Sequence, residues 1–340
     1  EPWSVSGNSA YQICQSTMGT EEEARLEAGF LWHRIRRKHS KSGLTASTLN
    51  FVPANGDPVE LMQATLTNQG SDPVSVDPIA AIPIYGRSAD NLRDHRHVTA
   101  LLHNTVCHTF GVLVKPSMSF DERGHTVNQT TYGVLGMDGD GNPPEGFTPL
   151  VEDFIGEGGN LAWPKTVLRD DPELTQAGSV FEGFESMGGL HFPCLNLQPG
   201  ESKSYLLILC ILSGEEKPTD FIEKYGEENK FGKAFKETKF YWHNRLAALH
   251  FDHQQGRRDG WLQWVTLQPE LRRIMGNSFL PYHDYGRGGR GWRDLWQDLL
   301  AILLTHQTKI DDDLLNHFAG IRMDGSNATI VGANPGEFKA

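Results

Sequence analysis

The sequence predicts a multi-domain chain in which an N-terminal antiparallel β-sandwich precedes a helical region. Two observations support this fold class. Residues 44–212 consist of short apolar or alternating runs separated by clusters of turn-forming residues. After Gly214 turn signals become rare, and Lys, Glu, Phe and Ala dominate, as is typical of helices. Because strands and helices do not alternate along the chain, a doubly wound parallel sheet is not expected.

Five runs in the first region have the character of strands. The run Leu206–Leu212 is nearly continuously apolar, which indicates a central strand buried on both faces. We therefore expect two packed antiparallel sheets. The basic run His33–Lys41 (HRIRRKHSK) is interpreted as a solvated turn or helix. The predicted strands are Val59–Leu66, Val98–Leu102, Thr109–Val114, Thr126–Val134 and Tyr205–Leu212.

The helical region starts after a polar joint, Glu215–Asp220 (EEKPTD). The run Phe221–Leu249 predicts two helices that are broken at Gly226 or Gly232. The expected boundaries are a sandwich at 1–214, a helical linker at 215–250 and the first helices of an all-α domain at 251–340. Because so few helices cannot bury their own apolar faces, we expect this chain to be a fragment of a longer protein. The later helices are expected at Leu267–Met275, Trp292–Thr305 and Asp312–Ile321.

Composition excludes several classes of function. A net charge of −12 offers no broad basic surface for nucleic acid. The longest apolar runs are too short to span a bilayer. The four cysteines are scattered without CxxC pairing, which indicates reduced thiols in a cytoplasmic protein and no zinc or redox motif. Neither Asp94–His97 (DHRH) nor Asp138–Asn142 (DGDGN) completes a known metal-binding pattern, so no metal is expected.

The most informative stretch is a Gly/Arg loop that runs directly into a two-faced helix, GRGGRGWRDLWQDLL. An arginine, two carboxylates and an amide at the start of one helix can bind vicinal sugar hydroxyls through charge-assisted hydrogen bonds. They can equally form a solvated face, with the carboxylates favoured by the helix dipole. Spacing alone leaves both interpretations open. The apolar face comprises Trp292, Leu295, Trp296, Leu299 and Leu303, and the polar face comprises Arg293, Asp294, Gln297 and Asp298.

Four motifs together resemble the inverting glycoside phosphorylases of glycoside hydrolase family 94. They are GRGGRGWRDLWQDLL, DHRHVTALLHN, SFDERGH and the final GANPGEFKA, and they occur in the expected order. The 1,2-β-oligoglucan phosphorylases and the phosphorylase-like part of cyclic β-1,2-glucan synthases are the most similar groups. The resemblance implies a β-sandwich, a helical linker and the start of an (α/α)6 barrel.

The resemblance also implies a reaction. Inorganic phosphate, as co-substrate, would attack a β-glucosidic bond and yield α-glucose 1-phosphate with inversion, without a metal or organic cofactor. Arg287 or Arg293 with Asp294 would hold the glucosyl unit, and Gln297 and Asp298 would support them. The general acid is expected beyond residue 340, so no catalytic residue is assigned and the chain alone is expected to be inactive.

Other functions stay open on sequence alone. An inverting hydrolase or a transglycosylase could use the same fold, and phosphate dependence would distinguish them from a phosphorylase. A non-catalytic carbohydrate-binding or assembly module is a third hypothesis from another class. The expected partners are an oligosaccharide, inorganic phosphate and a second copy in a homodimer, with neither nucleic acid nor membrane.

Overall fold

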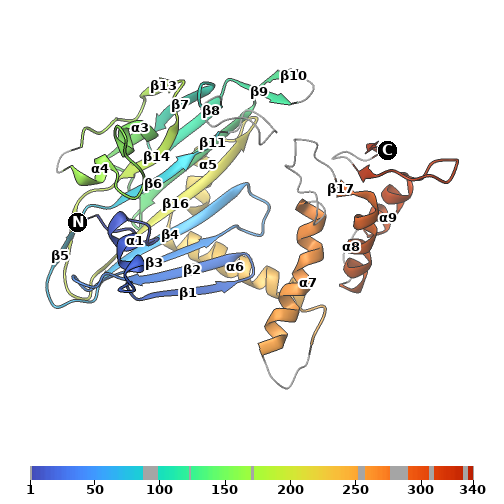
Figure 1. Cartoon of the computed structure of the whole chain (residues 1–340), viewed down its shortest axis with the longest axis horizontal. Coiled ribbons are helices and arrows are strands. Elements are labelled where there is room, and N and C mark those ends of the chain that lie inside the picture. Colours follow the sequence, from blue (N-terminus) through green and yellow to red (C-terminus); the bar gives the residue numbers. More distant parts are fainter. Residues whose placement is uncertain are drawn as a thin grey trace. The chain divides into compact units, whose positions relative to one another are not determined.

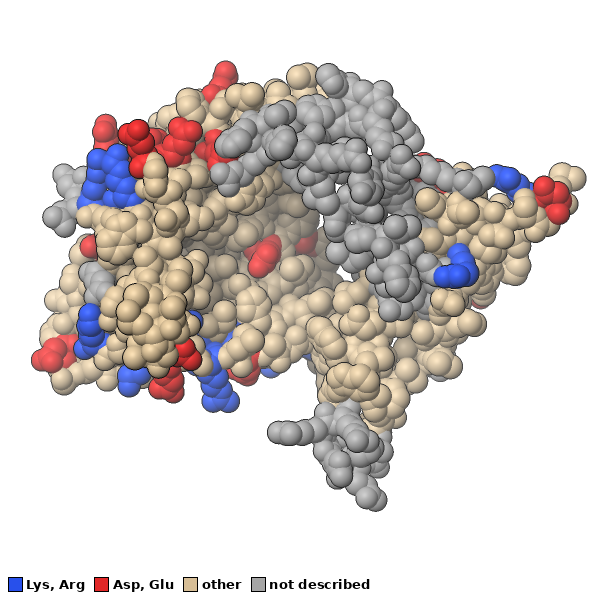
Figure 2. All heavy atoms as spheres, viewed as in Figure 1, with Lys and Arg blue, Asp and Glu red and all other residues tan. Residues whose placement is uncertain are grey.

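The computed structural model describes residues 2–86, 99–121, 124–169, 172–251, 257–275, 290–305, 310–331 and 336–339. These residues form two compact units. The first is made mostly of residues up to Thr238, and the second contains the residues from Lys239 onward. None of the described helices is long and apolar enough to cross a membrane. On the face drawn in Figure 2, Lys and Arg side chains lie scattered among Asp and Glu side chains.

The first unit is built on a nine-stranded sheet whose described strand pairings are all antiparallel (Figure 1). The predicted large antiparallel sheet is thus confirmed. In spatial order, its strands are β1 (Ala24–Gly29), β2 (Trp32–Lys38), β3 (Leu44–Phe51), β4 (Val59–Asn68), β16 (Ser202–Ser213), β11 (Thr130–Asp138), β8 (Gly111–Pro116), β7 (His103–His108) and β13 (Val180–Glu182).

Residues 205–208 of the central strand β16 are buried on both faces, as its continuous apolar run predicts, whereas Ile211 of the same run is 45% exposed. Tyr205 and Leu207 contribute to the core on one face of the sheet. The alternate residues Leu206 and Ile208 are fully buried on the other face. Because successive side chains of a strand point to opposite faces, one strand joins both cores of this unit.

A smaller sheet covers the first of these faces. It consists of β12 (Gly146–Leu150), β14 (Ser186–His191) and β6 (Ile79–Ile84), in that order. Phe147, Leu190 and Ile84 from its three strands join the same core as Leu207. The remaining elements are β5 (Val74–Val76) paired with β15 (Leu195–Leu197), β9 (Met118–Asp121) paired with β10 (Gly124–Val127), and α1 (Ala10–Thr17), α3 (Val151–Ile155) and α4 (Lys165–Leu168).

Two helices cover the opposite face of the large sheet, α5 (Pro218–Tyr225) and the start of α6 (Glu228–Leu246). The predicted break between them falls at Gly226, whereas Gly232 lies inside α6. A Cβ at Gly226 would lie 2.5 Å from the Ile222 carbonyl oxygen and 2.7 Å from the Met137 sulfur. Only glycine fits this position, because the helix end presses directly on the sheet.

In the second unit, the described residues form three further helices and a short sheet. The helices are α7 (Arg257–Met275), α8 (Trp292–Leu304) and α9 (Ile310–Phe318). All three were predicted, but α7 begins earlier and α9 ends earlier than expected. The sheet contains β17 (Arg290–Gly291), β18 (Ile330–Val331) and β19 (Phe338–Lys339). The start of an (α/α)6 barrel and the boundaries 1–214, 215–250 and 251–340 stay predictions.

Residues 33–38 of the basic run near the N-terminus belong to β2, so the interpretation of the run as a turn or helix was wrong there; residues 40 and 41 do lie in a turn. Trp32 of β2 packs edge-on against Phe235 of α6, with ring centroids 5.4 Å apart. On the same face, Arg34 and Arg36 lie 3.7 and 3.5 Å from the Glu27 carboxylate of β1. Pairing with an acid on the neighbouring strand therefore stabilises these arginines in a strand. Their charge conceals the alternation of apolar and polar residues by which a strand is usually recognised.

Of the other predicted strands, one was wrong and one is interrupted. The described part of Val98–Leu102 is helical at residues 99–100 and a turn at residues 101–102, where the Leu102 amide donates to the Thr99 carbonyl, and β7 starts at His103. The run Thr126–Val134 is divided between β10 and β11. The Asn128 side chain donates to the Pro116 and Thr130 carbonyls and so interrupts the strand.

The buried His191 makes the stability of this unit dependent on pH. Its Nε2 atom lies 2.9 Å from the Thr148 hydroxyl, and burial lowers the pKa of the imidazole to about 4. Below pH 6.5 this imidazole takes up a proton in the unfolded chain, whereas in the folded chain it stays neutral until the pH approaches about 4. We therefore expect the free energy of unfolding to fall between pH 6.5 and about 4, by a contribution on the order of 3 kcal/mol.

Urea titrations of wild type and His191→Gln across this pH range test the prediction. The substitution removes the titrating group but keeps an amide that can bond Thr148, so the pH dependence should flatten. The matched control is His243→Gln, at an exposed position of α6. Equal pH slopes for wild type and His191→Gln would contradict it.

Candidate substrate-binding site

The start of α8 is held by the short sheet that precedes it. Strand β17 runs directly into the helix and pairs with β18, which places Gly291 opposite Ile330. The Trp292 amide donates to the Thr329 carbonyl at 2.9 Å. Gly291 at the N-cap gives no side-chain hydrogen bond to the first turn. Backbone pairing, and not a capping side chain, therefore fixes where α8 begins.

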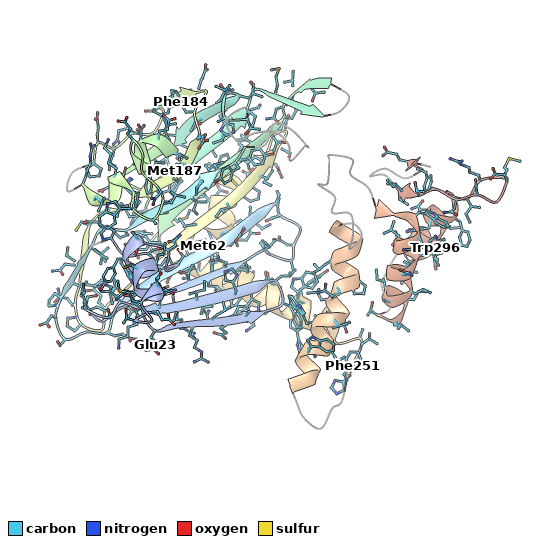
Figure 3. The ribbon with its side chains drawn as sticks, viewed as in Figure 1. Glu23, Met62, Phe184, Met187, Phe251 and Trp296 are labelled. Atoms are coloured by element: carbon cyan, nitrogen blue, oxygen red, sulfur yellow. The ribbon has the colours of Figure 1, made fainter. Side chains whose placement is uncertain are left out.

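An aromatic cluster attaches α8 to α9. The Trp292 indole N–H donates to the His317 carbonyl at 2.8 Å. The Trp296 ring stands nearly perpendicular to Phe318, with centroids 4.9 Å apart, and lies 5.5 Å from the His317 ring. Figure 3 shows Trp296 between the two helices. Edge-to-face contacts of this kind fix the rotation of a helix about its axis, so the opposite side of α8 has a defined orientation.

The buried side of α8 differs from the prediction at one position. Leu295, Leu299 and Ile302 are almost fully buried, and Ile302 packs with Ile310 of α9. Leu303, which was predicted for this face, is 42% exposed. Both residues lie close to the apolar stripe, and the position of α9 favours Ile302.

The structure describes the five predicted sugar-binding residues to different extents. Arg293 and Gln297 are exposed and lie one turn apart on α8. Residues four apart on a helix are neighbours on its surface, so these two can act on one ligand. Asp294 and Asp298 belong to α8, but their side chains lie outside the described residues, as does the whole of Arg287. Binding of sugar by this set stays a prediction.

The incomplete calcium pattern Asp138–Asn142 forms a turn that a lysine neutralises. Lys203 Nζ lies 3.0 Å from the Asp138 carboxylate and 2.6 Å from Asp140. The described residues contain no group of three or more His, Cys, Asp or Glu that could hold a metal ion. The motif Asp94–His97 lies outside the described residues.

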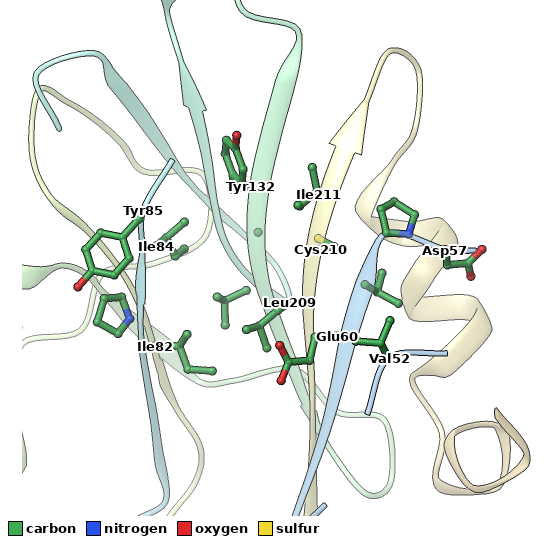
Figure 4. A pocket seen from close by; sticks show the side chains of 15 residues that line it. Val52, Asp57, Glu60, Ile82, Ile84, Tyr85, Tyr132, Leu209, Cys210 and Ile211 are labelled. Atoms are coloured by element: carbon green, nitrogen blue, oxygen red, sulfur yellow. The ribbon is translucent and has the colours of Figure 1, made fainter. Parts of the chain in front are cut away.

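A pocket on the large sheet was not predicted from the sequence. It has a volume of about 410 Å³ and lies between β6 and the end of the sheet formed by β4, β16 and β11 (Figure 4). Its floor consists of two cross-strand rows, Glu60–Leu209–Val134 and Ile211–Tyr132. Ile82 and Ile84 of β6 form a wall. Glu60 lies in the run predicted as a strand, where an acid among apolar residues is the usual sign of a solvent-facing position.

The two acids of this pocket differ in their surroundings. Asp57 accepts hydrogen bonds from Lys224, at 2.5 Å, and from the Tyr225 hydroxyl. Burial raises the pKa of Asp57, but the bonds from Lys224 and Tyr225 outweigh it and hold this pKa below the usual value. The Glu60 residue is half-buried, and its carboxylate has neither an ion pair nor a hydrogen bond to the described residues. Only Glu60 is therefore available to a ligand.

Residues 3–228, more than half of the chain, match the model of the glycosyl hydrolase 94 supersandwich domain. The chain belongs to glycosyl hydrolase family 94. This is a family of carbohydrate-active enzymes, and its supersandwich corresponds to the first unit described above. The matched residues end at the start of α6, so they include the pocket but not α8.

Other comparisons add little. No curated protein matches the chain. Among solved structures, a polysaccharide lyase is similar over 56% of this chain, with 15% sequence identity and a TM-score of 0.26. The region of similarity spans only 22% of the length of the lyase chain. A similarity this weak carries no argument about activity.

The hydrogen bond between Trp292 and His317 can be tested directly. Replacement of Trp292 by Phe removes the N–H donor and leaves the His317 carbonyl without it, at a cost of about 1 kcal/mol. We expect faster amide hydrogen exchange in α8 and α9, measured by mass spectrometry. The control is Trp261→Phe, because Trp261 of α7 is 65% exposed. Unchanged exchange in Trp292→Phe would show that the bond does not hold α8.

Proposed function

We propose that this family 94 protein acts in the inverting phosphorolysis of β-glucosidic bonds, with β-1,2-glucooligosaccharides as substrates. Inorganic phosphate attacks C1, the bond from C1 to the glycosidic oxygen breaks, and the leaving oxygen takes a proton from a general acid. The products are α-glucose 1-phosphate and a shortened oligosaccharide. No described residue is assigned as the general acid, and no metal or organic cofactor is invoked.

The family match carries the proposal at the level of a carbohydrate-active enzyme. The finer proposal is supported by α8, where Arg293 and Gln297 lie exposed on a helix whose other side is held by the aromatic cluster. A guanidinium donates several hydrogen bonds in a fixed geometry, and an amide both donates and accepts. Such a pair suits the vicinal hydroxyls of a glucosyl unit. Asp294 and Asp298 of the same helix complete the proposed set, with Arg287 before it.

Activity assays with and without phosphate test the reaction. The 340-residue chain and any longer protein that contains it are each incubated with β-1,2-glucooligosaccharides, and glucose 1-phosphate is quantified. We expect glucose 1-phosphate only when phosphate is present and only from a protein that also contains the general acid, and therefore none from the 340-residue chain. Free glucose released without phosphate would identify a hydrolase instead. Sugar binding without any turnover would identify a binding module.

The role of Arg293 gives a second test. Loss of a charge-assisted hydrogen bond to a substrate costs about 1.5–3 kcal/mol, so Arg293→Ala should lower kcat/KM by about tenfold to a hundredfold. Gln297→Ala should lower it less, because an amide makes weaker hydrogen bonds. Arg322→Ala, at an exposed position of the same unit, serves as the control. A wild-type kcat/KM in Arg293→Ala would remove this residue from the site.

We also propose a cytoplasmic location and a homodimer. All four cysteines are free, and burial raises the pKa of Cys107 to about 11 and of Cys210 to about 12, so that both stay unreactive thiols. Free thiols of this kind are typical of reducing compartments.

A further inference from the structure

We propose that the pocket between β6 and the large sheet binds a short stretch of neutral oligosaccharide through Glu60, as a second sugar-binding site of the chain. The inference rests on the proposed function for the identity of the sugar. The proposed site contains only residues of the first unit and no residue of α8.

The shape of the pocket suits a small ligand. At about 410 Å³ it falls within the range of small-molecule sites, which are mostly apolar and contain few polar groups. Leu209 and Ile211 form much of the floor, and Ile82 and Ile84 form the wall, as Figure 4 shows. Ile211 is 45% exposed although it lies on the central strand. These aliphatic surfaces can pack against the C–H faces of a sugar ring.

The polar groups of the pocket select the chemistry of the ligand. The Glu60 carboxylate only accepts hydrogen bonds, so its partner must be a donor such as a hydroxyl or an amine. The negative charge of Glu60, which no described residue compensates, disfavours phosphates and other anions. A neutral sugar supplies hydroxyl donors and apolar C–H faces together.

The edge of β6 offers further hydrogen-bonding groups. Among the described strands β6 pairs only with β14, so its outer edge has backbone groups without a strand partner. Carbonyls at this edge can accept from sugar hydroxyls, and amides can donate to sugar oxygens. Pro83 removes one donor from the strand and makes the pairing of another protein strand at this edge less favourable. A polyhydroxylated ligand is therefore a better occupant than an extended peptide.

Titration of the 340-residue chain with β-1,2-glucotetraose, followed by NMR and calorimetry, tests this site. Glu60→Gln keeps the size of the side chain and removes its charge. We expect the affinity of one binding event to fall about tenfold, as for loss of one charged hydrogen bond. The matched control is Glu182→Gln, an exposed acid on the edge strand β13, which should bind as wild type. Equal affinities for wild type and Glu60→Gln would overturn the proposal.

A double variant, Arg293→Ala with Gln297→Ala, distinguishes failure of this site from failure of the proposed function. If the double variant retains the Glu60-dependent binding event, the pocket binds sugar regardless of α8. If it loses all tetraose binding, the pocket proposal is wrong and the α8 proposal stands. Hexylamine is titrated in parallel. Glu60-dependent binding of this amine without binding of the tetraose would show a cation site and overturn the sugar assignment.

Discussion

The two-sided burial of β16 is the constraint on which the rest of the first unit depends. Its side chains alternate between a core shared with the smaller sheet and a core shared with α5 and α6. Removal of either cover would expose a nearly continuous apolar strand to water, at a cost of roughly 25 cal/mol for each Å² of apolar surface. The positions of the smaller sheet and the two helices are therefore coupled through one strand, although they do not touch the same face.

The same arrangement explains the pocket. The smaller sheet covers one part of the large sheet and ends at β6, so no second layer formed by the described residues covers the strand ends beyond it. Strand β16 therefore begins in the core, and its later residues Leu209 and Ile211 form part of the pocket floor. A sandwich whose two sheets differ in width leaves such an opening, and in this chain the opening lies on a rigid frame of paired strands.

Much of the fold could be predicted because burial leaves a clear mark on sequence. Residues buried on both faces, as at positions 205–208, are apolar without alternation, and the packing of Gly226 against Met137 demands glycine. The strand β2 could not be recognised, because Arg34 and Arg36 owe their place to Glu27, a residue of another strand. Asn128 likewise interrupts a strand, in part through the Pro116 carbonyl, which only the folded chain brings near.

The candidate sites differ in the same way. The faces of α8 could be derived from helical spacing, apart from the choice between Ile302 and Leu303, which the position of α9 decides. The Glu60 pocket could not be derived, because it depends on the register of three strands and on where a second sheet stops. Local periodicity predicts a helix face, whereas a pocket between sheets requires long-range pairing.

The order of the strands has a consequence for how the protein is made. β4 and β11 become neighbours of β16 only after residue 202 has been synthesised, because β16 is the last strand of its sheet along the chain. Until then the two halves of the sheet present unpaired inner edges that are rich in apolar residues. Such edges favour aggregation and slow folding. A nascent chain of this protein should therefore depend on chaperones until β16 closes the sheet.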